Sequence, residues 1–382
     1  MNPVVNLTRG GNRRTEVQAR ATAVSLFSGA GGMDVGFRQA GFDILFANDI
    51  DKAAVETYRR NLGDHVVLGD IEDHLSSLSR FAGVDCLFGG PPCQGFSVAG
   101  KMATDDPRSQ LVRTFMRAVE IVRPRAFVME NVKALGTLAK FKPVRDDLRA
   151  SADRLGYRTE LHILNAKDFG VPQARERVFL VGFSDAVSIQ FDSRIRTHRR
   201  APITTLEALR KTGPQGTAAN PKTCNAVITI AERPVLRRSP YAGMMFNGLG
   251  RPLNPHAPCA TLPASMGGNK TPIIDERQFF GDGTSWIETY HAHLTAGGAP
   301  YALPEAPAHI RRLTLEEARI LHTFPEGYDF AGGRSATYRQ IGNAVPCDLA
   351  LAVAQATIDV LEDTVIDDLG DHEPALRFAF GS

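Results

Sequence analysis

The chain repeats one pattern after its first twenty residues: a short apolar run, a glycine or acidic break, and a stretch with helical spacing. Strand-like runs of this kind fall within the segments 21–41, 42–63, 64–74, 84–93 and 123–132. A hairpin pair is predicted for two later strand-like runs, within 156–170 and 175–184. Strands that alternate with helices predict a largely parallel sheet with helices on both faces. We therefore expect an α/β fold with a Rossmann-like, doubly wound sheet.

The pattern stops near Ser184, and the segment that follows is rich in Pro, Gly and Asn. Eleven Lys and Arg residues against two acids lie between Arg194 and Arg251, although the whole chain has a net charge of only +2. Such a local basic excess is typical of a nucleic-acid surface, or of a solvated loop-rich face. We expect a flexible leader, a sheet domain in two pieces, and a smaller, loop-rich inserted domain, with the bounds 1–20, 21–185 with 309–382, and 186–308.

Several classes of protein are disfavoured by what the sequence lacks. The five cysteines form no CxxC pair and no Cys/His spacing that suits zinc, so we expect no metal site. An odd number of cysteines without a framework is typical of a reduced, cytoplasmic chain. No run approaches the length of a membrane span, and the N-terminal residues lack the apolar region of a secretory signal. We expect a cytoplasmic protein with no membrane association.

The stretch FSGAGG, residues 27–32, joins the first predicted strand to the first helix. Its glycines let a ligand approach the backbone at a helix N-terminus, although a plain tight turn has the same composition. Asp49 and Asp70 end the next two strands, where an acid binds ribose hydroxyls or an amine, or caps a helix. Ile50 and Ile71 follow these acids and offer apolar faces to an adenine ring. Since no P-loop lysine is present, the pattern predicts an adenosine-bearing cofactor other than a nucleoside triphosphate.

Cys93 follows the fourth predicted strand, in the stretch FGGPPCQGFS. Two prolines fix the backbone before it, and a polar loop that contains glycine follows. A thiolate nucleophile needs a polar, partly open site, whereas most lone cysteines are small buried hydrophobic residues. Cys86, inside the apolar stretch VDCLF, fits the buried alternative. Cys93 is therefore the predicted nucleophile.

An acid and two arginines are predicted to lie near Cys93. Glu130 ends the fifth strand, which sequential pairing places beside the fourth. Arg175 and Arg177 are two residues apart on a strand, so their side chains share one face, and an exposed edge strand is the alternative. A nucleophile and an acid on neighbouring strand ends form a candidate reaction pair.

These stretches, in this order, resemble the motifs of the DNA cytosine-5 methyltransferases. The similarity extends from Val24 to about Val360. FSGAGG, ANDID and GDI are similar to that family's cofactor motifs, and GGPPCQGFS is similar to its catalytic loop. The later motifs are matched by ENV, QARERVF, RRLTLEEARILHTFP and QIGNAVP, with the long basic insert before the last two. The resemblance implies an enzyme of the bacterial restriction–modification type that uses S-adenosylmethionine and releases S-adenosylhomocysteine.

The resemblance also implies a role for each catalytic candidate. Cys93 would attack carbon 6 of a flipped-out cytosine, after which carbon 5 takes the methyl group. Glu130 would contact ring nitrogen 3 and the amine, and Asn131 would position the catalytic loop. Arg177 would hold the carbonyl oxygen of the base, and Arg175 would brace the acid and the loop.

Two larger sets of residues are implied for the cofactor and for DNA. The cofactor pocket would be lined by Phe27, Ser28, Gly29, Gly31, Asp49, Ile50, Asp70, Ile71, Pro92, Asn343 and Val345, of which the last two come from the resemblance alone. The insert would be a target-recognition domain, in which Thr261-Leu262 followed by two glycines is similar to a short element near the flipped base. The implied DNA contacts are Ser97, Arg108, Arg237, Arg238, Arg251, Thr261, Gly267 and Gly268.

The resemblance implies double-stranded DNA as the substrate and an enzyme that acts as a monomer in the cytoplasm, associated with the nucleoid through DNA. A cognate restriction endonuclease would act separately, and a solitary regulator is the alternative. A transfer-RNA cytosine-5 methyltransferase shares the architecture, but the long basic insert argues against it. The intact Cys93, Glu130, Arg175 and Arg177 argue against a non-catalytic DNA-binding protein. A small-molecule methyltransferase would leave the basic insert unexplained.

Overall fold

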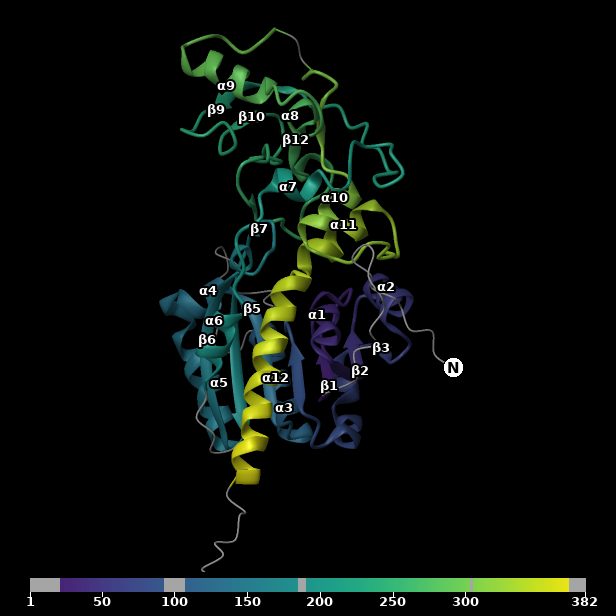
Figure 1. Ribbon diagram of the computed structural model, residues 1–382, viewed down its shortest axis with the longest axis vertical. Helices are drawn as coiled ribbons and strands as arrows, with labels where there is room; N and C mark the ends of the chain where they lie inside the picture. The colour runs from purple at the N-terminus through teal and green to yellow at the C-terminus, as the bar shows by residue number, and fades with distance from the viewer. Residues whose placement is uncertain (1–20, 93–106, 185–189, 303–304, 371–382) are drawn as a thin grey trace, which may run out of the picture.

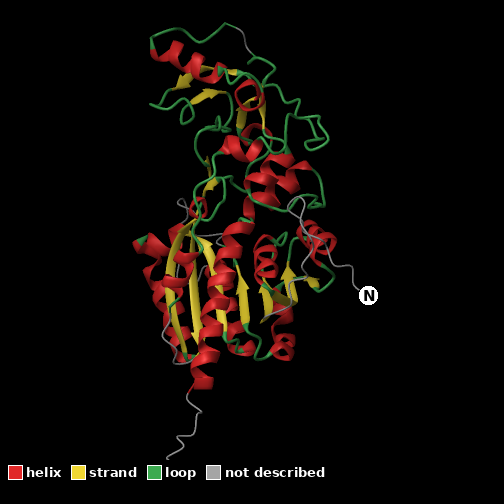
Figure 2. Cartoon of the chain, viewed as in Figure 1, coloured by secondary structure: helices red, strands yellow, loops and turns green. Residues whose placement is uncertain are grey.

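The computed structural model describes residues 21–92, 107–184, 190–302 and 305–370. The expected leader at 1–20, Cys93 and Ser97 lie outside the described residues. Figures 1 and 2 show a lower lobe built around one large sheet and an upper lobe of short strands and helices.

The large sheet has seven strands in the order β3-β2-β1-β4-β5-β8-β6. The strands from β3 to β5 are parallel to their neighbours, whereas β8 runs antiparallel to both β5 and β6. This confirms the α/β fold class, and β6 and β8 are the predicted hairpin pair. The bounds are Ala21–Leu26 for β1, Phe42–Asp49 for β2, Val66–Leu68 for β3, Cys86–Gly89 for β4, Ala126–Val132 for β5, Tyr157–Asn165 for β6 and Glu176–Ser184 for β8.

Helices cover both faces of this sheet, because successive side chains of a strand point to opposite faces. Cys86 and Phe88 belong to one core cluster, with α1, α6 and α12, whereas Leu87 belongs to the cluster on the other face, with η1, α3 and α5. The bounds are Gly32–Ala40 for α1, Lys52–Leu62 for α2, Ile71–Phe81 for the 3₁₀ helix η1, Pro107–Val122 for α3, Lys133–Thr137 for α4, Lys142–Arg154 for α5, Phe191–Thr197 for α6 and Cys347–Gly370 for α12.

The last helix, α12, is a core element of the lower lobe and crosses the face of the sheet beside α1 (Figure 1). A helical stretch over 334–363 is long and apolar enough to span a membrane by length and composition alone. However, 72% of its apolar window is buried inside the protein, as in the core helix of a soluble fold. Gly36 allows the close approach of the two helices, since a Cβ there would lie 2.4 Å from the backbone nitrogen of Leu351.

The upper lobe holds three two-stranded sheets, which pair β9 with β10, β12 with β13, and β11 with β7. Its strands are Gln173–Ala174 (β7), Ile230–Val235 (β9), Met244–Phe246 (β10), Cys259–Ala260 (β11), Ile273–Asp275 (β12) and Ile310–Arg312 (β13). Its helices are Thr205–Leu209 (α7), Glu276–Phe280 (α8), Trp286–Thr295 (α9), Leu315–Leu321 (α10) and Arg334–Asn343 (α11). The expected boundary at residue 309 separates β12 from its partner β13, and the division into domains stays a prediction.

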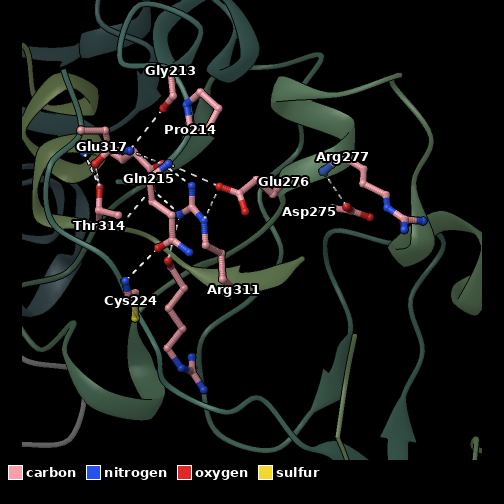
Figure 3. Close-up of polar contacts among 12 residues, drawn as sticks. Gly213, Pro214, Gln215, Cys224, Asp275, Glu276, Arg277, Arg311, Thr314 and Glu317 are labelled. Atoms are coloured by element: carbon pink, nitrogen blue, oxygen red, sulfur yellow. Dashed lines mark hydrogen bonds and ion pairs between the residues drawn. The ribbon is translucent and has the colours of Figure 1, made fainter. Parts of the chain in front are cut away.

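A buried ion-pair network joins the insert to the segment that follows it (Figure 3). Arg311, on β13 and 2% exposed, donates through Nε to Glu276 on α8 at 3.1 Å. Its terminal nitrogens form a bidentate pair with Glu317 on α10 at 2.9 and 2.7 Å. Glu317 also accepts from Asn220 at 3.0 Å and from the backbone N–H of Thr314 at 2.8 Å. The network therefore fixes α8 against α10.

Replacing Arg311 with methionine is expected to lower the free energy of unfolding by about 3–5 kcal/mol, because Glu317 would stay buried without its cation. Urea denaturation of the full chain measures this loss. The matched control is Lys142→Ala, which removes an exposed ion pair to Asp146 and should cost about 1 kcal/mol or less. Equal losses in the two variants would contradict the importance of the buried network.

Candidate active site

The glycine turn after β1 and the carboxylate after β2 are held together by hydrogen bonds. Asp49 accepts from the backbone N–H of Gly29 at 2.7 Å and from that of Asp51 at 2.8 Å. Burial raises the pKa of Asp49, and these backbone hydrogen bonds oppose the rise. Phe27, Gly29 and Gly31 all have positive φ, and a Cβ added at Gly29 would meet no atom within 4 Å. The turn therefore leaves open space beside its backbone, as a bound ligand requires.

The other predicted cofactor residues lie at the neighbouring strand ends with unequal exposure. Ile50 is 70% exposed, whereas Ile71 is 2% exposed and packs in the core, so Ile50 alone of the two offers open apolar surface. Asp70 is exposed, and its carboxylate caps η1 by accepting from the N–H of Glu72 at 3.0 Å. Pro92 is half-buried at the end of the segment after β4.

Segment 343–345, far away in sequence, lies against the glycine turn. A Cβ added at Gly32 would lie 2.6 Å from the carbonyl oxygen of Val345 and 2.9 Å from the Cβ of Ala344. Asn343 is exposed at the end of α11, and Val345 is 5% exposed. The structure thus brings Val345, which was inferred from the resemblance alone, close to the turn inferred from the sequence pattern, and Asn343 lies two residues before it.

Glu130 and Arg177 form an ion pair on adjacent strands. Arg177 Nε lies 2.9 Å from Glu130 Oε1, and the two side chains are 15% and 12% exposed. Burial raises the pKa of Glu130, and the positive charges of Arg177 and Arg175 oppose that rise. A Cβ added at Gly90 would lie 2.8 Å from the carboxylate oxygen Oε2 of Glu130. The backbone that leads to Cys93 therefore passes directly over this carboxylate.

Asn131 holds the proline segment that precedes Cys93. Its side chain is 2% exposed and donates through Nδ2 to the carbonyl of Pro91 at 3.0 Å. Its own Oδ1 accepts from the N–H of Val132 at 2.9 Å. The second bond orients the Asn131 amide, and the first anchors the segment before the predicted catalytic loop to β5.

Among the described residues, four cysteines are buried and free, namely Cys86, Cys224, Cys259 and Cys347. Burial raises the pKa of the Cys259 thiol to about 12, and it raises the pKa of Cys86 and of Cys347 well above the ordinary value. A thiol with a raised pKa is a poor nucleophile at neutral pH. None of these three cysteines therefore competes with Cys93 as the predicted nucleophile.

Arg175 does not share a strand with Arg177, so that prediction was wrong. It lies in a break between β7 and β8, because Gln173 and Ala174 pair with β11 of the insert. Its buried guanidinium donates to the carbonyl of Leu262 at 3.0 Å and to that of Gly342 at 2.9 Å. Burial and the neighbouring Arg177 lower the pKa of Arg175 to about 9, so it is still charged at neutral pH. Arg175 therefore braces the insert and the end of α11.

The predicted recognition element is attached to the same segment. Thr261 donates through its hydroxyl to the carbonyl of Ala174 at 3.0 Å. Gly267 and Gly268 both have positive φ, and no atom lies within 4 Å of a Cβ added at either. The predicted DNA-contacting arginines of the insert are exposed at Arg237, Arg238 and Arg251. Arg108 belongs to α3, and its side chain lies outside the described residues.

Three further residues near this element were not predicted from the sequence. Gln173 and His322 are fully buried and hydrogen-bonded to each other at 3.1 Å. Leu249 is 61% exposed on a turn. The backbone N–H groups of Leu249 and Gly250 both donate to the carbonyl of Asn269 at 3.0 Å. The available signals were the glutamine of QARER and the apolar residue between two glycines in NGLGR.

Comparison with known proteins agrees with this geometry. The family model described as C-5 cytosine-specific DNA methylase matches residues 21–359. The chain is 33% identical to Type II methyltransferase M1.HphI of Haemophilus parahaemolyticus, over 88% of this chain and 86% of that protein. It is 31% identical to Type II methyltransferase M.NgoFVII of Neisseria gonorrhoeae, over 89% of this chain and 87% of that protein.

A solved structure shows the same fold at lower identity. The crystal structure of a DNA modification methyltransferase encoded within an E. coli prophage matches with a TM-score of 0.62 and 22% identity, over 90% of this chain and 99% of that chain. The family model covers most of this chain, from β1 into α12. The chain therefore belongs to the C-5 cytosine-specific DNA methylase family.

Proposed function

We propose that the protein transfers a methyl group from S-adenosylmethionine to carbon 5 of a flipped-out cytosine within a specific short sequence of double-stranded DNA. The reaction proceeds through a covalent adduct between Cys93 and carbon 6. The observation that carries the proposal is the partly buried pair of Glu130 and Arg177, 2.9 Å apart, with the backbone at Gly90 against the carboxylate. This pair can hold a cytosine edge beside the predicted position of the thiol.

The chemistry assigns one task to each residue. The Cys93 thiolate forms a bond to carbon 6, and the displaced electron pair moves through the ring toward nitrogen 3. Glu130, whose pKa is raised by burial, donates its proton there, while Arg177 binds the carbonyl oxygen of the base. Carbon 5 is then nucleophilic and takes the methyl group. Water removes the carbon 5 proton, the bond to Cys93 breaks, and nitrogen 3 returns its proton to Glu130.

The residues around the glycine turn fit S-adenosylmethionine, which supplies an electrophilic methyl group on a sulfonium sulfur when bound. Gly29 leaves open space beside the backbone, and the exposed Ile50 can pack on the adenine ring. Each oxygen of Asp49 accepts one backbone N–H and has a further lone pair for a ribose hydroxyl. Asp70 is open to an exocyclic amine.

We place the enzyme in a Type II restriction–modification setting, since relatives similar over most of the chain are described as Type II methyltransferases. A monomer in the cytoplasm would then protect DNA from a separate endonuclease. We favour duplex DNA over transfer RNA as the substrate, because the matching family model is one of DNA methylases and the chain carries a long basic insert with exposed arginines for phosphate contacts.

The test is to incubate the protein with S-adenosylmethionine and bacterial genomic DNA, and then to map 5-methylcytosine by sequencing. Methylation of one short motif is the expected result, and it would identify the sequence that the insert recognises. Transfer of the methyl group to transfer RNA but not to duplex DNA would overturn the choice of substrate. Binding of DNA without methylation of any substrate would indicate a non-catalytic DNA-binding protein.

Replacing Leu249 with alanine is expected to lower kcat/KM on duplex DNA by about 10- to 100-fold. A large apolar side chain exposed on a rigid turn suits insertion into a base stack, where it offsets the cost of flipping a base out. A Cβ at Gly248 would lie 2.6 Å from the carbonyl oxygen of Asn269, so the turn cannot easily be shifted. Methylation assays should show a smaller loss when the target cytosine is mismatched, because a mismatched base costs less to extrude.

The matched control is Ile163→Ala, at an apolar residue 41% exposed on the edge strand β6 of the large sheet. It should leave kcat/KM within about 2-fold, as expected for a surface change. If the loss in Leu249→Ala is the same for paired and mismatched targets, the side chain does not assist base extrusion.

A further inference from the structure

Both backbone polar groups of Leu262, next to the recognition threonine, are bound by side chains of the arginine motif. Its N–H donates to Gln173 Oε1 at 2.9 Å, and its carbonyl accepts from Arg175 at 3.0 Å. All three residues are at most 1% exposed. Because neither bond is open to water, displacing Leu262 would leave buried polar groups unpaired. The two side chains therefore set the position of the recognition segment.

The same amide and guanidinium groups also bind the end of α11 and the chain at the end of α10. Arg175 donates its other terminal nitrogen to the carbonyl of Gly342 at 2.9 Å. Gln173 donates through Nε2 to the carbonyl of Leu321 at 3.2 Å and to His322 Nδ1 at 3.1 Å. Each side chain thus forms a bridge that begins at Leu262.

The hydrogen bonds assign the tautomer of His322. Gln173 Oε1 is occupied as an acceptor, so the amide nitrogen must be the donor and Nδ1 the acceptor. The imidazole proton is then on Nε2, which is buried beside the backbone of Ala344. Burial, with Arg175 and Arg177, holds the pKa of His322 well below its usual range, and the backbone of Ala344 opposes this. His322 is therefore a neutral imidazole, and its ring lies near Ala344.

The Arg175 bridge ends on segment 342–345, which also touches the glycine turn, and the Gln173 bridge reaches that segment through His322, whose ring lies near Ala344. A Cβ added at Gly342 would lie 2.5 Å from the carbonyl oxygen of Pro263, the residue after Leu262. A Cβ added at Gly32 would lie 2.6 Å from the carbonyl oxygen of Val345. Segment 342–345 is thus packed closely between the recognition segment and the cofactor turn.

We propose that Gln173 and His322 are positioning residues that couple cofactor binding to the placement of the recognition segment on DNA. The inference rests on the proposed function, because it takes residues 343 and 345 as cofactor contacts. A cofactor that orders this segment fixes Ala344 and Gly342, and the two bridges carry that order to Leu262 and Thr261. By linkage, DNA then strengthens cofactor binding by the same factor by which the cofactor strengthens DNA binding.

The experiment measures the Kd of the full-length protein for its mapped duplex, with and without saturating S-adenosylhomocysteine. In the wild-type chain the cofactor product should tighten DNA binding by about 5- to 150-fold. His322→Leu removes the acceptor for Gln173 and breaks that bridge, so this factor should fall several-fold below the wild-type value, with the remainder carried by the Arg175 bridge. The Kd for S-adenosylhomocysteine alone should change by less than about 3-fold. His322→Asn keeps an acceptor at the position of Nδ1 and should retain most of the coupling.

A coupling factor in His322→Leu equal to that of the wild-type protein would overturn the inference. A wild-type factor of one would also overturn it, and methylation of DNA by the same preparation would show that the proposed function still holds. Failure to bind both DNA and S-adenosylhomocysteine would overturn the two together. If His322→Leu does not fold, hydrogen exchange of residues 259–262 in the wild-type protein decides: slower exchange on adding S-adenosylhomocysteine supports the coupling, and unchanged exchange refutes it.

Discussion

Replacing Cys93 with serine is expected to reduce methyl transfer to DNA by about 10⁴-fold or more, as is typical when a covalent nucleophile is removed. A serine hydroxyl at neutral pH is a far weaker nucleophile than a thiolate. A serine would need a general base to remove its proton, and the described residues at this end of the sheet include none that is free for that task. Glu130, on β5, is already paired with Arg177 at 2.9 Å. DNA binding and cofactor binding should be retained, so the loss should appear in kcat.

Two measurements test this expectation. Transfer of a labelled methyl group from S-adenosylmethionine gives the rate, and a duplex with 5-fluorocytosine at the target gives the covalent adduct. After methylation of the fluorinated ring there is no carbon 5 proton to remove, so the bond between Cys93 and carbon 6 persists. The wild-type protein should therefore form an adduct that survives denaturation, and Cys93→Ser should form none.

Cys224→Ser is the matched control, because Cys224 is buried at 7% exposure in the upper lobe. It should form the adduct and methylate DNA at close to the wild-type rate. Normal methylation by Cys93→Ser, or an adduct mapped to another cysteine, would show that the reaction uses a different nucleophile.

The catalytic core of the sheet was predictable from sequence because its signals are local. The apolar runs mark the strands, so Asp49 could be placed at the end of β2 and Glu130 near the end of β5 from neighbouring residues alone, although β5 continues to Val132. The hairpin pairing of β6 with β8 follows from two strand-like runs separated by a short segment. The packing of Gly90 against Glu130 likewise requires only that β4 and β5 be neighbours.

The contacts of Arg175 were not predictable in this way. Two arginines at alternate positions suggested one continuous strand, but β7 pairs with β11, which lies more than eighty residues later in the chain. That pairing breaks the strand at Arg175 and turns the guanidinium toward Leu262 and Gly342. His322 was missed for the same reason, since its partner Gln173 is 149 residues away. Short strands held by such distant partners leave little periodicity for a sequence pattern to reveal.

Replacing Glu130 with glutamine is expected to lower kcat by about 10²- to 10⁴-fold, the range over which a general acid contributes. Glutamine has nearly the same shape and can still accept from Arg177, but it has no ionisable proton to give to nitrogen 3. Because burial is the largest influence on this carboxyl and raises its pKa, the wild-type protein keeps more of the acid form at a given pH than an exposed glutamate does. The control is Glu176→Gln, which removes an exposed ion pair to Lys133 and should leave kcat within about 2-fold.

The pH dependence separates an acid from a mere acceptor. Dividing the two rates removes any pH dependence that the wild-type protein and Glu130→Gln share. If the protonated carboxyl is the active form, the ratio of wild-type to variant rate is largest below the raised pKa of Glu130 and falls as the pH rises through it. A ratio that instead grows with pH would mean that the ionised carboxylate acts by accepting from the cytosine amine. The proton on nitrogen 3 would then have to come from another group, and the acid role given to Glu130 would be wrong.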